Sequence, residues 1–438
     1  MNRRHGFILL AVIEKLSGNN VWDLQRRSCR MEGQNQNSGN KIANRIITCV
    51  FLLLVFGLTI AGFFSPVRAR SESENRNLAQ KPAFSFEALF AKEEEKRYTV
   101  QYEKYLSDQF VGRDAWIGLK TRTERLLGKT DINGVYFAGD GYLVTKTEAS
   151  KVDHVQEEKN IKRLVEFVKK YQESLGEGHV HAMIVPTAAY VFADKLPPFT
   201  SEYDQGALFD RLGKDLPQGS FINAAEELLA HADEYVYYRT DHHQTALGAY
   251  YDYRAWAEAT GHVVRELSEY SMSIGSEEFY GTLYSKINLP MRADTVTIYD
   301  DGKSYRVEYD MSGKKKNGLF VKERLAEKDK YMVYLDGNHA MADIVKMGDG
   351  GKESAQQGED SADLKAQGKR TLLVIKDSYA HTFVPFLAQD YDRVIMVDFR
   401  YSKMPVSMMV EQFGVTDLLV MYNATNFISD ENLYQLER

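Results

Sequence analysis

The chain has 438 residues, of which 44% are hydrophobic and 27% charged, and its formal net charge is −7. This composition is typical of a folded protein and argues against a largely disordered chain. The negative charge gives the long-range field the wrong sign for attracting nucleic acid, so we expect no nucleic-acid partner. The length allows one large α/β domain with smaller attachments.

The first marked feature along the chain is the uncharged run Ile46–Phe64, with the sequence IITCVFLLLVFGLTIAGFF. At about 1.5 Å per residue, a helix of this length spans about 30 Å, the thickness of the hydrocarbon core of a bilayer. Basic residues precede the run, namely Arg26, Arg27, Arg30, Lys41 and Arg45. Their excess predicts a cytoplasmic N-terminal tail (residues 1–45), a single-pass transmembrane anchor in the cell membrane (46–64) and an extracytoplasmic remainder. The alternative is a cleaved signal peptide, for which Pro66–Ala69 offers only a poor cleavage pattern.

Both cysteines, Cys29 and Cys49, lie before or within the apolar run. The rest of the chain therefore has no disulfide and no thiolate metal site. Freedom from cysteine fits an exported domain that folds without redox help, although a cytoplasmic domain can also lack cysteine.

Residues 65–83 are polar and predict a linker. Residues 84–145 predict a helical stalk or cap that ends in a hairpin. Helical periodicity runs from Phe84 to Leu127, and the hairpin signal is the segment Asn133–Val144, in which two short aromatic and β-branched runs flank Gly-Asp-Gly.

Residues 146–438 predict the catalytic domain. An amphipathic helix at Val152–Leu175 is followed by the apolar run His179–Val191, which stops at Pro186 as a buried parallel strand would. A helix near Ala224–Ala232, a short strand at Glu234–Tyr238 and a helix at Gln244–Thr260 come next. The segment Thr240-Asp241-His242-His243 is thus predicted at the end of a strand, where open α/β sheets place their sites.

Residues 265–345 are rich in acidic residues and tyrosine and predict a small inserted or edge β region. Residues 346–370 lack periodicity and predict a mobile surface loop. From Thr371 onward, apolar strands and helices alternate, with strands at Thr371–Ser378, Arg393–Arg400 and Asp417–Asn423. This β-α-β-α-β order predicts parallel strands joined by right-handed crossovers, and hence a doubly wound α/β sheet.

Ser378 is the candidate nucleophile. It closes an apolar strand and opens a helix, so its hydroxyl is expected at the edge of the sheet, where backbone N–H groups and the helix dipole favour a developing oxyanion. The alternative is that Asp377 and Ser378 only cap the helix.

Asp241 and His243 can supply the base that a serine hydroxyl needs. In an extended segment, residues i and i+2 point the same way, so Asp241 can orient the ring of His243 toward Ser378 while His242 points elsewhere. One alternative is a helix cap with buried structural imidazoles. A zinc site is a second alternative, but no third strong ligand follows at motif spacing, and we expect no metal and no cofactor.

Several motifs resemble the DHHW protein family, over most of the chain from Phe84 onward: TDHHQTALGAYYDY (240–253), GTLYSK (281–286), DGNHA (336–340), IKDSYAHTFVPFL (375–387) and VDFRYS (397–402). Gln244 stands where the family name has Trp. DHHW proteins in turn resemble the SGNH-like acetyltransferases of alginate and other exopolysaccharide systems, in which a D-x-H pair precedes the serine strand. The resemblance implies an SGNH-hydrolase-like fold, with Asp241 and His243 as the D-x-H pair and Ser378 as the nucleophile.

Other residues are candidates for binding the oxyanion or the substrate. Asn423 ends the last strand, where SGNH folds place an oxyanion-binding Asn, and its alternative role is in a turn. Arg400 and Tyr401 end the strand that follows Ser378, and they can bind a sugar or form a surface ion pair. Asn338 and His339 belong to a family motif whose role the residues do not indicate. They can line the pocket or build a turn.

These inferences predict a membrane-anchored SGNH-like acyltransferase that O-acetylates a cell-surface or secreted polysaccharide. The resemblance implies a membrane-bound O-acyltransferase as the partner that delivers the acyl group. Two alternatives stay open. In a glycan O-acetyl esterase, water replaces the acceptor sugar, and a non-catalytic glycan-binding or assembly component would have kept the fold and lost the reaction.

Overall fold

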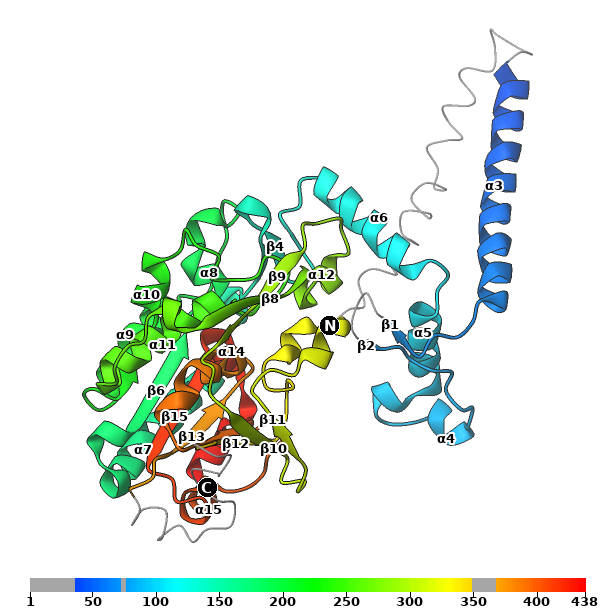
Figure 1. The fold of residues 1–438 in the computed structure, drawn as a ribbon. Helices are drawn as coiled ribbons and strands as arrows, with labels where there is room; N and C mark the ends of the chain where they lie inside the picture. Colours follow the sequence, from blue (N-terminus) through cyan, green and yellow to red (C-terminus); the bar gives the residue numbers. More distant parts are fainter. Residues whose placement is uncertain (1–35, 72–75, 349–367) are drawn as a thin grey trace. The chain divides into compact units, whose positions relative to one another are not determined.

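The computed structural model describes residues 36–71, 76–348 and 368–438 (Figure 1). The chain divides into two compact units. The first comprises the residues up to Ala69 together with Leu78–Arg113, and the second comprises Arg70–Asn77 together with Asp114–Arg438. All candidate site residues belong to the second unit.

The first unit contains the long helix α3 (Gln36–Phe64) and the shorter helices α4 (Phe86–Leu89) and α5 (Tyr98–Asp108). Residues Lys41–Phe64 of α3 are long and apolar enough to cross a membrane, and they are unburied. The helix contains the predicted anchor 46–64 and begins ten residues before it, at Gln36. Most of the predicted tail, residues 1–35, lies outside the described residues.

The segment predicted as a stalk contains α4, α5 and α6 (Arg113–Leu126), with non-helical residues between them. Within the predicted linker, β1 (Arg70–Ser71) and β2 (Arg76–Asn77) pair antiparallel. A small antiparallel sheet follows, made of β3 (Asp131–Ile132), β4 (Val135–Phe137) and β5 (Leu143–Thr145). β4 and β5 form a hairpin around Gly139-Asp140-Gly141. Its turn requires positive φ at Asp140 (55°) and Gly141 (76°), a conformation that glycine adopts easily.

A central eight-stranded sheet forms the body of the second unit, in the order β11-β10-β12-β14-β13-β15-β6-β7. Its strands are, in chain order, β6 (Val180–Val185), β7 (Phe221–Ile222), β10 (Tyr305–Tyr309), β11 (Lys315–Asn317), β12 (Met341–Lys346), β13 (Thr371–Lys376), β14 (Arg393–Val397) and β15 (Asp417–Asn423). The five strands from β14 to β7 run parallel, whereas β12, β10 and β11 extend one edge in antiparallel fashion.

Helices cover both faces of this sheet (Figure 1). Along β13, Leu372 and Val374 join one apolar core, while Leu373 and Ile375 join the other. The first core is closed by α8 (Ala188–Val191), α10 (Ala225–Ala230), α11 (Ala246–Thr260) and α14 (Ala380–Leu387); the second by α7 (His154–Leu175), α9 (Gln205–Asp215), α15 (Val406–Gln412) and α16 (Ala424–Ser429). Strands buried on both faces are therefore apolar at nearly every position, and the predicted doubly wound α/β fold is confirmed.

The region predicted as a β insertion, residues 265–345, has two parts. β8 (Ser271–Phe279) and β9 (Asp294–Asp300) pair with each other in a separate two-stranded sheet. The remaining strands, β10, β11 and β12, form the antiparallel edge of the central sheet itself. Within the loop predicted at 346–370, residues 349–367 lie outside the described residues.

The expected strand at Glu234–Tyr238 is wrong. This segment is irregular, and its β pairing is a single bridge between Tyr237 and Gln244. The Asp241–His243 segment therefore lies in a loop before α11. Side-chain contacts, described below, hold this loop where strand pairing was expected to do so.

Candidate active site

Ser378 lies in the tight turn between β13 and α14, and its side chain is nearly covered, with 8% exposure. The turn is fixed through its neighbour Asp377. This carboxylate accepts hydrogen bonds from the backbone N–H of Tyr379 at 2.9 Å, from the N–H and the side-chain amide of Asn423 at 2.9 and 2.7 Å, and from the amide of Asn426 at 2.9 Å. Because Asn423 ends the adjacent strand β15, the sheet itself holds the serine turn.

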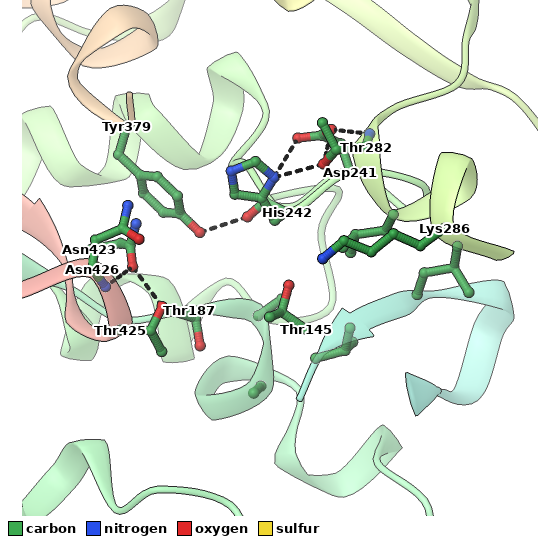
Figure 2. Close-up of a pocket in the computed structure, with 15 residues that line it drawn as sticks. Thr145, Thr187, Asp241, His242, Thr282, Lys286, Tyr379, Asn423, Thr425 and Asn426 are labelled. Carbon is green, nitrogen blue, oxygen red and sulfur yellow. Dashed lines mark hydrogen bonds and ion pairs between the residues drawn. The ribbon is translucent and has the colours of Figure 1, made fainter. Parts of the chain in front are cut away.

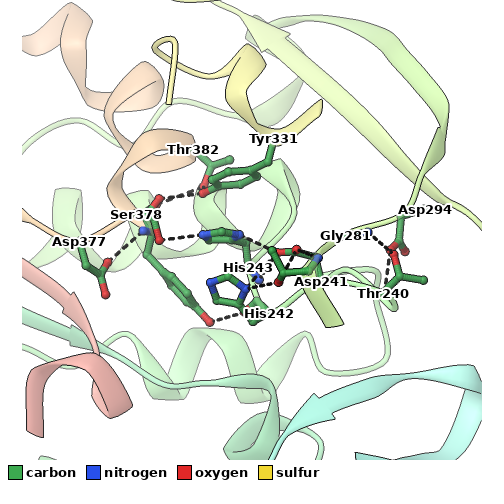
Figure 3. A network of polar contacts seen from close by, with 12 residues as sticks. Thr240, Asp241, His242, His243, Gly281, Asp294, Tyr331, Asp377, Ser378 and Thr382 are labelled. Atoms are coloured by element: carbon green, nitrogen blue, oxygen red, sulfur yellow. Dashed lines mark hydrogen bonds and ion pairs between the residues drawn. The ribbon is translucent and has the colours of Figure 1, made fainter. Parts of the chain in front are cut away.

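His243 connects Ser378 to Asp241 (Figure 3). Its Nε2 lies 2.7 Å from the Ser378 hydroxyl oxygen, and its Nδ1 lies 2.6 Å from Oδ1 of Asp241. The same Oδ1 also accepts the backbone N–H of His243 at 3.0 Å. With the proton on Nδ1, the ring presents a free lone pair to the hydroxyl, which is the tautomer that a general base requires.

The second oxygen of Asp241 is bound by helix α12 (Thr282–Ile287). The backbone N–H and the hydroxyl of Thr282 donate to Oδ2 at 2.6 and 2.9 Å. The preceding residue has to be glycine, because a Cβ at Gly281 would lie 2.3 Å from both Cβ and Oδ2 of Asp241. The start of α12 therefore fixes the carboxylate through close backbone approach.

The loop that carries Asp241 and His243 is anchored to Asp294 at the start of β9 (Figure 3). The backbone N–H groups of Arg239 and Thr240 donate to this carboxylate at 2.8 and 2.7 Å, and the hydroxyls of Thr240 and Tyr235 donate as well. Burial raises the pKa of Asp294, while these donors lower it. This anchor replaces the strand that was predicted to end at Tyr238.

Two tyrosines that the sequence did not single out contact the two histidines. The Tyr331 ring stacks on that of His243, with centroids 3.9 Å apart and planes at 10°. Its hydroxyl donates to the Ser378 carbonyl at 2.9 Å. The hydroxyl of Tyr379 donates to the carbonyl of His242 at 2.6 Å. The motif IKDSYAHTFVPFL includes Tyr379 without indicating its contact, and no sequence signal distinguished Tyr331 from neighbouring tyrosines.

His242 lies closer to the site than the alternation argument predicted. Its Nδ1 is 2.9 Å from the hydroxyl oxygen of Thr282 and 3.4 Å from Oδ1 of Asp241, and its ring centroid is 3.9 Å from that of His243. The loop is not an extended strand, so residues 242 and 243 do not simply face opposite ways. His242 has no contact with Ser378, and with 34% of its side chain exposed it lines an adjoining pocket.

The electrostatics of the site favour a charged Asp241 beside an uncharged His242. Burial acts to raise the pKa of Asp241, but His242, His243 and the hydrogen bonds outweigh it and hold that pKa well below the usual range. Burial, reinforced by His243, lowers the pKa of His242. At neutral pH Asp241 is therefore ionised and His242 uncharged, so the carboxylate is available to stabilise a proton on His243.

Asn423 lies on the wall of the pocket, but its polar atoms already have partners. Its amide nitrogen donates to Asp377, and its amide oxygen accepts from Thr425 and from the N–H of Asn426, capping α16. An oxyanion role would use the second hydrogen of its amide. The backbone N–H of Ser378 makes no hydrogen bond within the described part of the chain, which makes it a further candidate donor.

The four remaining candidates gather away from this pocket. Arg400 binds Asp398 at 2.9 and 2.6 Å and reaches the amide oxygen of Asn338 at 3.3 Å, while Tyr401 is exposed beside it. His339 lies 2.8 Å from a carboxylate oxygen of Asp310. None of these four lines the pocket beside His242. Asp398 also binds Lys376 at 3.2 Å, so Arg400 belongs to an ion-pair group at the end of β13.

A metal can be considered because potential ligand atoms of Asp241, His242 and His243 lie within 4.8 Å of one another. However, both ring nitrogens of His243 are engaged, one with Asp241 and the other with Ser378. A cation bound through His243 would have to break one of these contacts. The observed arrangement therefore suits proton transfer from a serine better than metal ligation.

The fold and site define an α/β protein of SGNH-like architecture. In its site, hydrogen bonds link a serine to a histidine and the histidine to an aspartate. The DHHW protein family matches residues 159–397, and the chain belongs to this family. Comparison with curated proteins gives no match.

Among solved structures, a DHHW family protein from Eubacterium siraeum is 24% identical, with a TM-score of 0.54 over 70% of this chain and 96% of that one. Bacillus cereus PatB1, solved with a sulfonyl adduct, is 16% identical, with a TM-score of 0.54 over 69% of this chain and 98% of that one. The O-acetyltransferase domain of Pseudomonas putida AlgJ is 14% identical and fits loosely, with a TM-score of 0.38 over 69% of this chain and 98% of that one. The first two likenesses establish a shared fold.

Proposed function

We propose that this protein is a membrane-anchored, extracytoplasmic acyltransferase that moves an acyl group, in particular acetyl, to a hydroxyl of a polysaccharide. One observation carries the proposal: Ser378 Oγ lies 2.7 Å from His243 Nε2, while Nδ1 of the same ring lies 2.6 Å from Asp241. A serine with an oriented base in a nearly covered site is the arrangement that nucleophilic catalysis needs. The family's resemblance to SGNH-like acetyltransferases supports acetyl as the group.

In the proposed reaction, His243 Nε2 takes the hydroxyl proton as Ser378 Oγ bonds to the acyl carbonyl carbon. The leaving group of the donor departs with that proton, and an acyl-serine remains. The acceptor hydroxyl then gives its proton to Nε2 and attacks the acyl-serine, and the proton returns to Ser378 Oγ as the ester bond to the serine breaks. Asp241 orients the ring and stabilises its cationic form throughout. No cofactor takes part in this scheme.

The proposed location follows from α3, in which Lys41–Phe64 can span a bilayer. The basic residues before the apolar run favour a cytoplasmic N-terminus and an extracytoplasmic catalytic domain. Such a domain has no access to cytoplasmic acyl donors, and a membrane-bound O-acyltransferase is the partner proposed to deliver the acyl group.

A glycan esterase would use the same residues, with water in place of the acceptor hydroxyl. The pocket beside His242 can hold a sugar in either reaction, and the family's resemblance to SGNH-like acetyltransferases favours transfer. A non-catalytic binding role would leave the buried contact between Ser378 and His243 without a use.

The test is turnover of p-nitrophenyl acetate by the full-length protein in detergent, compared with Ser378→Ala. We expect release of p-nitrophenol by the wild type and none above background by the variant. Ser174→Ala on α7 is the matched control and should retain the wild-type rate. Since PatB1 accepts a sulfonyl adduct, a sulfonyl fluoride should add one sulfonyl group to the wild type and to Ser174→Ala, as seen by intact mass. The absence of both turnover and labelling at Ser378 in the folded wild type would refute the serine mechanism.

A further inference from the structure

A groove leads away from the base along the small sheet and the end of β15. The inner hollow, about 280 Å³, lies beside His242 and Tyr379, which are the chain neighbours of His243 and Ser378. An outer hollow of about 560 Å³ shares three of its lining residues, Thr145, Thr425 and Asn426. The two hollows therefore adjoin, and together they can hold more than one sugar residue of a polymer.

The inner hollow has a mostly apolar lining, in which hydroxyl and amide groups are interspersed. Its polar lining includes Thr145, Thr187, Thr282, Thr425, Asn423 and Asn426. Hydroxyl and amide side chains can both donate and accept hydrogen bonds, which suits the many hydroxyls of a sugar ring.

Lys286 brings a positive charge to this lining. It lies on α12, and Figure 2 shows its amine directed into the pocket between His242 and Thr145. Within the described part of the chain the amine has no carboxylate within ion-pair distance. Asp241, the acidic residue of the lining, is occupied by His243 and by Thr282.

The lysines of the outer hollow differ in this respect. Lys151 pairs with Glu148 at 2.8 Å, and Lys146 lies 3.3 Å from Asp131 and 3.8 Å from Glu148. Their charges are neutralised by these neighbours. The groove therefore presents its uncompensated positive charge at Lys286, close to the reacting centre.

We propose that Lys286 recognises a negative charge on the acceptor, so that the inner hollow takes a sugar unit bearing a carboxylate or a phosphate. The outer hollow then takes the neighbouring unit of the same chain. This inference rests on the proposed function, since it names the class of acceptor for that reaction. A lysine amine is a compact charge that can pair with either anion, and in a partly enclosed hollow the pairing is stronger than in open water.

The position of Lys286 couples this recognition to the catalytic centre. It lies four residues after Thr282, one turn along the helix whose first residue binds Asp241. Residues at this spacing lie on the same face of a helix. An anion held by Lys286 is thereby placed at a fixed offset from the Asp241–His243 pair, which favours acylation of a hydroxyl near the charged group.

The experiment measures binding by the full-length protein in detergent with Ser378→Ala, so that no turnover occurs. The probes are tetragalacturonate, its fully methyl-esterified neutral form, and an oligomer of glycerol phosphate. We expect one of the anionic probes to bind at least about tenfold more tightly than the neutral ester at low salt. Adding Lys286→Gln should remove this preference, Lys286→Arg should keep most of it, and the control Lys162→Gln, on the exposed face of α7, should not change it. The two anionic probes distinguish carboxylate from phosphate.

Equal binding of charged and neutral probes, absence of binding by either anionic probe, or a preference that survives Lys286→Gln would overturn the inference. The outcome is separable from that of the proposed function. Charge-dependent binding without turnover by the wild type would leave Lys286 as part of a glycan-binding site and refute the enzyme. Turnover by the wild type together with equal binding of the charged and neutral probes would support the enzyme and refute the role of Lys286.

Discussion

The ring of Tyr331 lies flat against the imidazole of His243, 3.9 Å away between centroids, and its hydroxyl donates to the carbonyl of Ser378 at 2.9 Å. One side chain thus contacts both the proposed base and the residue that carries the proposed nucleophile. The stacking restricts rotation of the His243 ring, and the hydrogen bond ties the serine turn to the same support. Tyr331 is therefore a positioning residue for the contact between Nε2 and Oγ.

The two contacts of Tyr331 can be separated by substitution. Tyr331→Phe keeps the stacking and loses the contacts of the hydroxyl with the Ser378 carbonyl and with Thr382, so we expect kcat on p-nitrophenyl acetate to fall roughly two- to tenfold. Tyr331→Ala also removes the ring that restricts the His243 imidazole, and displacement of a catalytic group can lower kcat by up to about a hundredfold. The pH profile should keep its shape in Tyr331→Phe. Equal rates in the wild type and a well-folded Tyr331→Ala would contradict the positioning role.

Separate roles for the two adjacent histidines give a second prediction. His243→Ala removes the group 2.7 Å from the serine hydroxyl, and we expect kcat to fall by about a hundredfold or more, the usual range for loss of a general base. His242→Ala removes a neighbour that touches Asp241 but not Ser378, so its loss in kcat should stay below about tenfold. Steady-state kinetics on both variants, with circular dichroism as the folding control, check this. Equal losses in two folded variants would count against His243 as the base.

The main elements of the fold could be predicted because parallel strands buried on both faces are continuous apolar runs, as in Thr371–Lys376 and Asp417–Asn423. For Tyr305–Tyr309 and Met341–Lys346, the sequence left open whether they join the edge of the central sheet or form an insertion. Their own sequences specify strands but not partners, and the partner β14 lies about fifty residues beyond β12. The false strand at Glu234–Tyr238 has the apolar and tyrosine composition of a strand, but contacts with Asp294 decide its conformation.

Part of the site followed from local patterns. Asp241, His243 and Ser378 were candidates because their residue types and spacing suit a serine mechanism, and the structure brings their side chains together; their catalytic roles stay predictions. The supporting residues were not found, because Thr282, Asp294 and Tyr331 act on residues 41, 54 and 47 positions away in the sequence. A signal existed for one of them. The motif GTLYSK contains the glycine and threonine that hold Asp241, but no single-sequence argument gave them that role.

Gly281 offers a test of how closely the carboxylate is held. A Cβ there would lie 2.3 Å from Oδ2 of Asp241, so Gly281→Ala has to displace either the carboxylate or the start of α12. We expect kcat to fall at least tenfold, with a lower melting temperature, because overpacking typically costs about 1–3 kcal/mol. Gly178→Ala is the matched control, since a Cβ there meets no atom within 4 Å. Wild-type activity in Gly281→Ala would show that the contact is not required.

The apolar helix gives a prediction about location. A reporter fused after Arg70 should behave as extracytoplasmic, and the protein should stay in the membrane fraction after washing with high salt. Salt screens surface attachment but leaves a buried apolar helix in place. A chain that starts near Arg70 and remains soluble would indicate cleavage of the segment. A cytoplasmic reporter would contradict export, and with it an extracellular polysaccharide acceptor.

Asp252 gives a prediction about stability and pH. It lies inside α11 with 0% exposure, and neither carboxylate oxygen has a hydrogen-bond partner among the described residues. Burial raises the pKa of Asp252 well above its usual value. An acid with a raised pKa in the folded state binds its proton more tightly there than in the unfolded chain, where the pKa is about 3.9. Its contribution to stability is therefore complete below about pH 4 and is lost as the pH rises through the folded-state pKa.

Asp252→Asn removes this titration and keeps the shape of the protonated acid. We expect the free energy of unfolding of the wild type, relative to the variant, to fall between pH 4 and 8 with a slope of up to about 1.4 kcal/mol per pH unit, the value for one proton. Other buried acids with raised pKa values, such as Asp294 and Asp377, are common to both proteins and cancel in the difference. Guanidinium unfolding midpoints of both proteins across this range give the measurement. A difference that stays constant with pH would mean that Asp252 is not the buried proton-binding group.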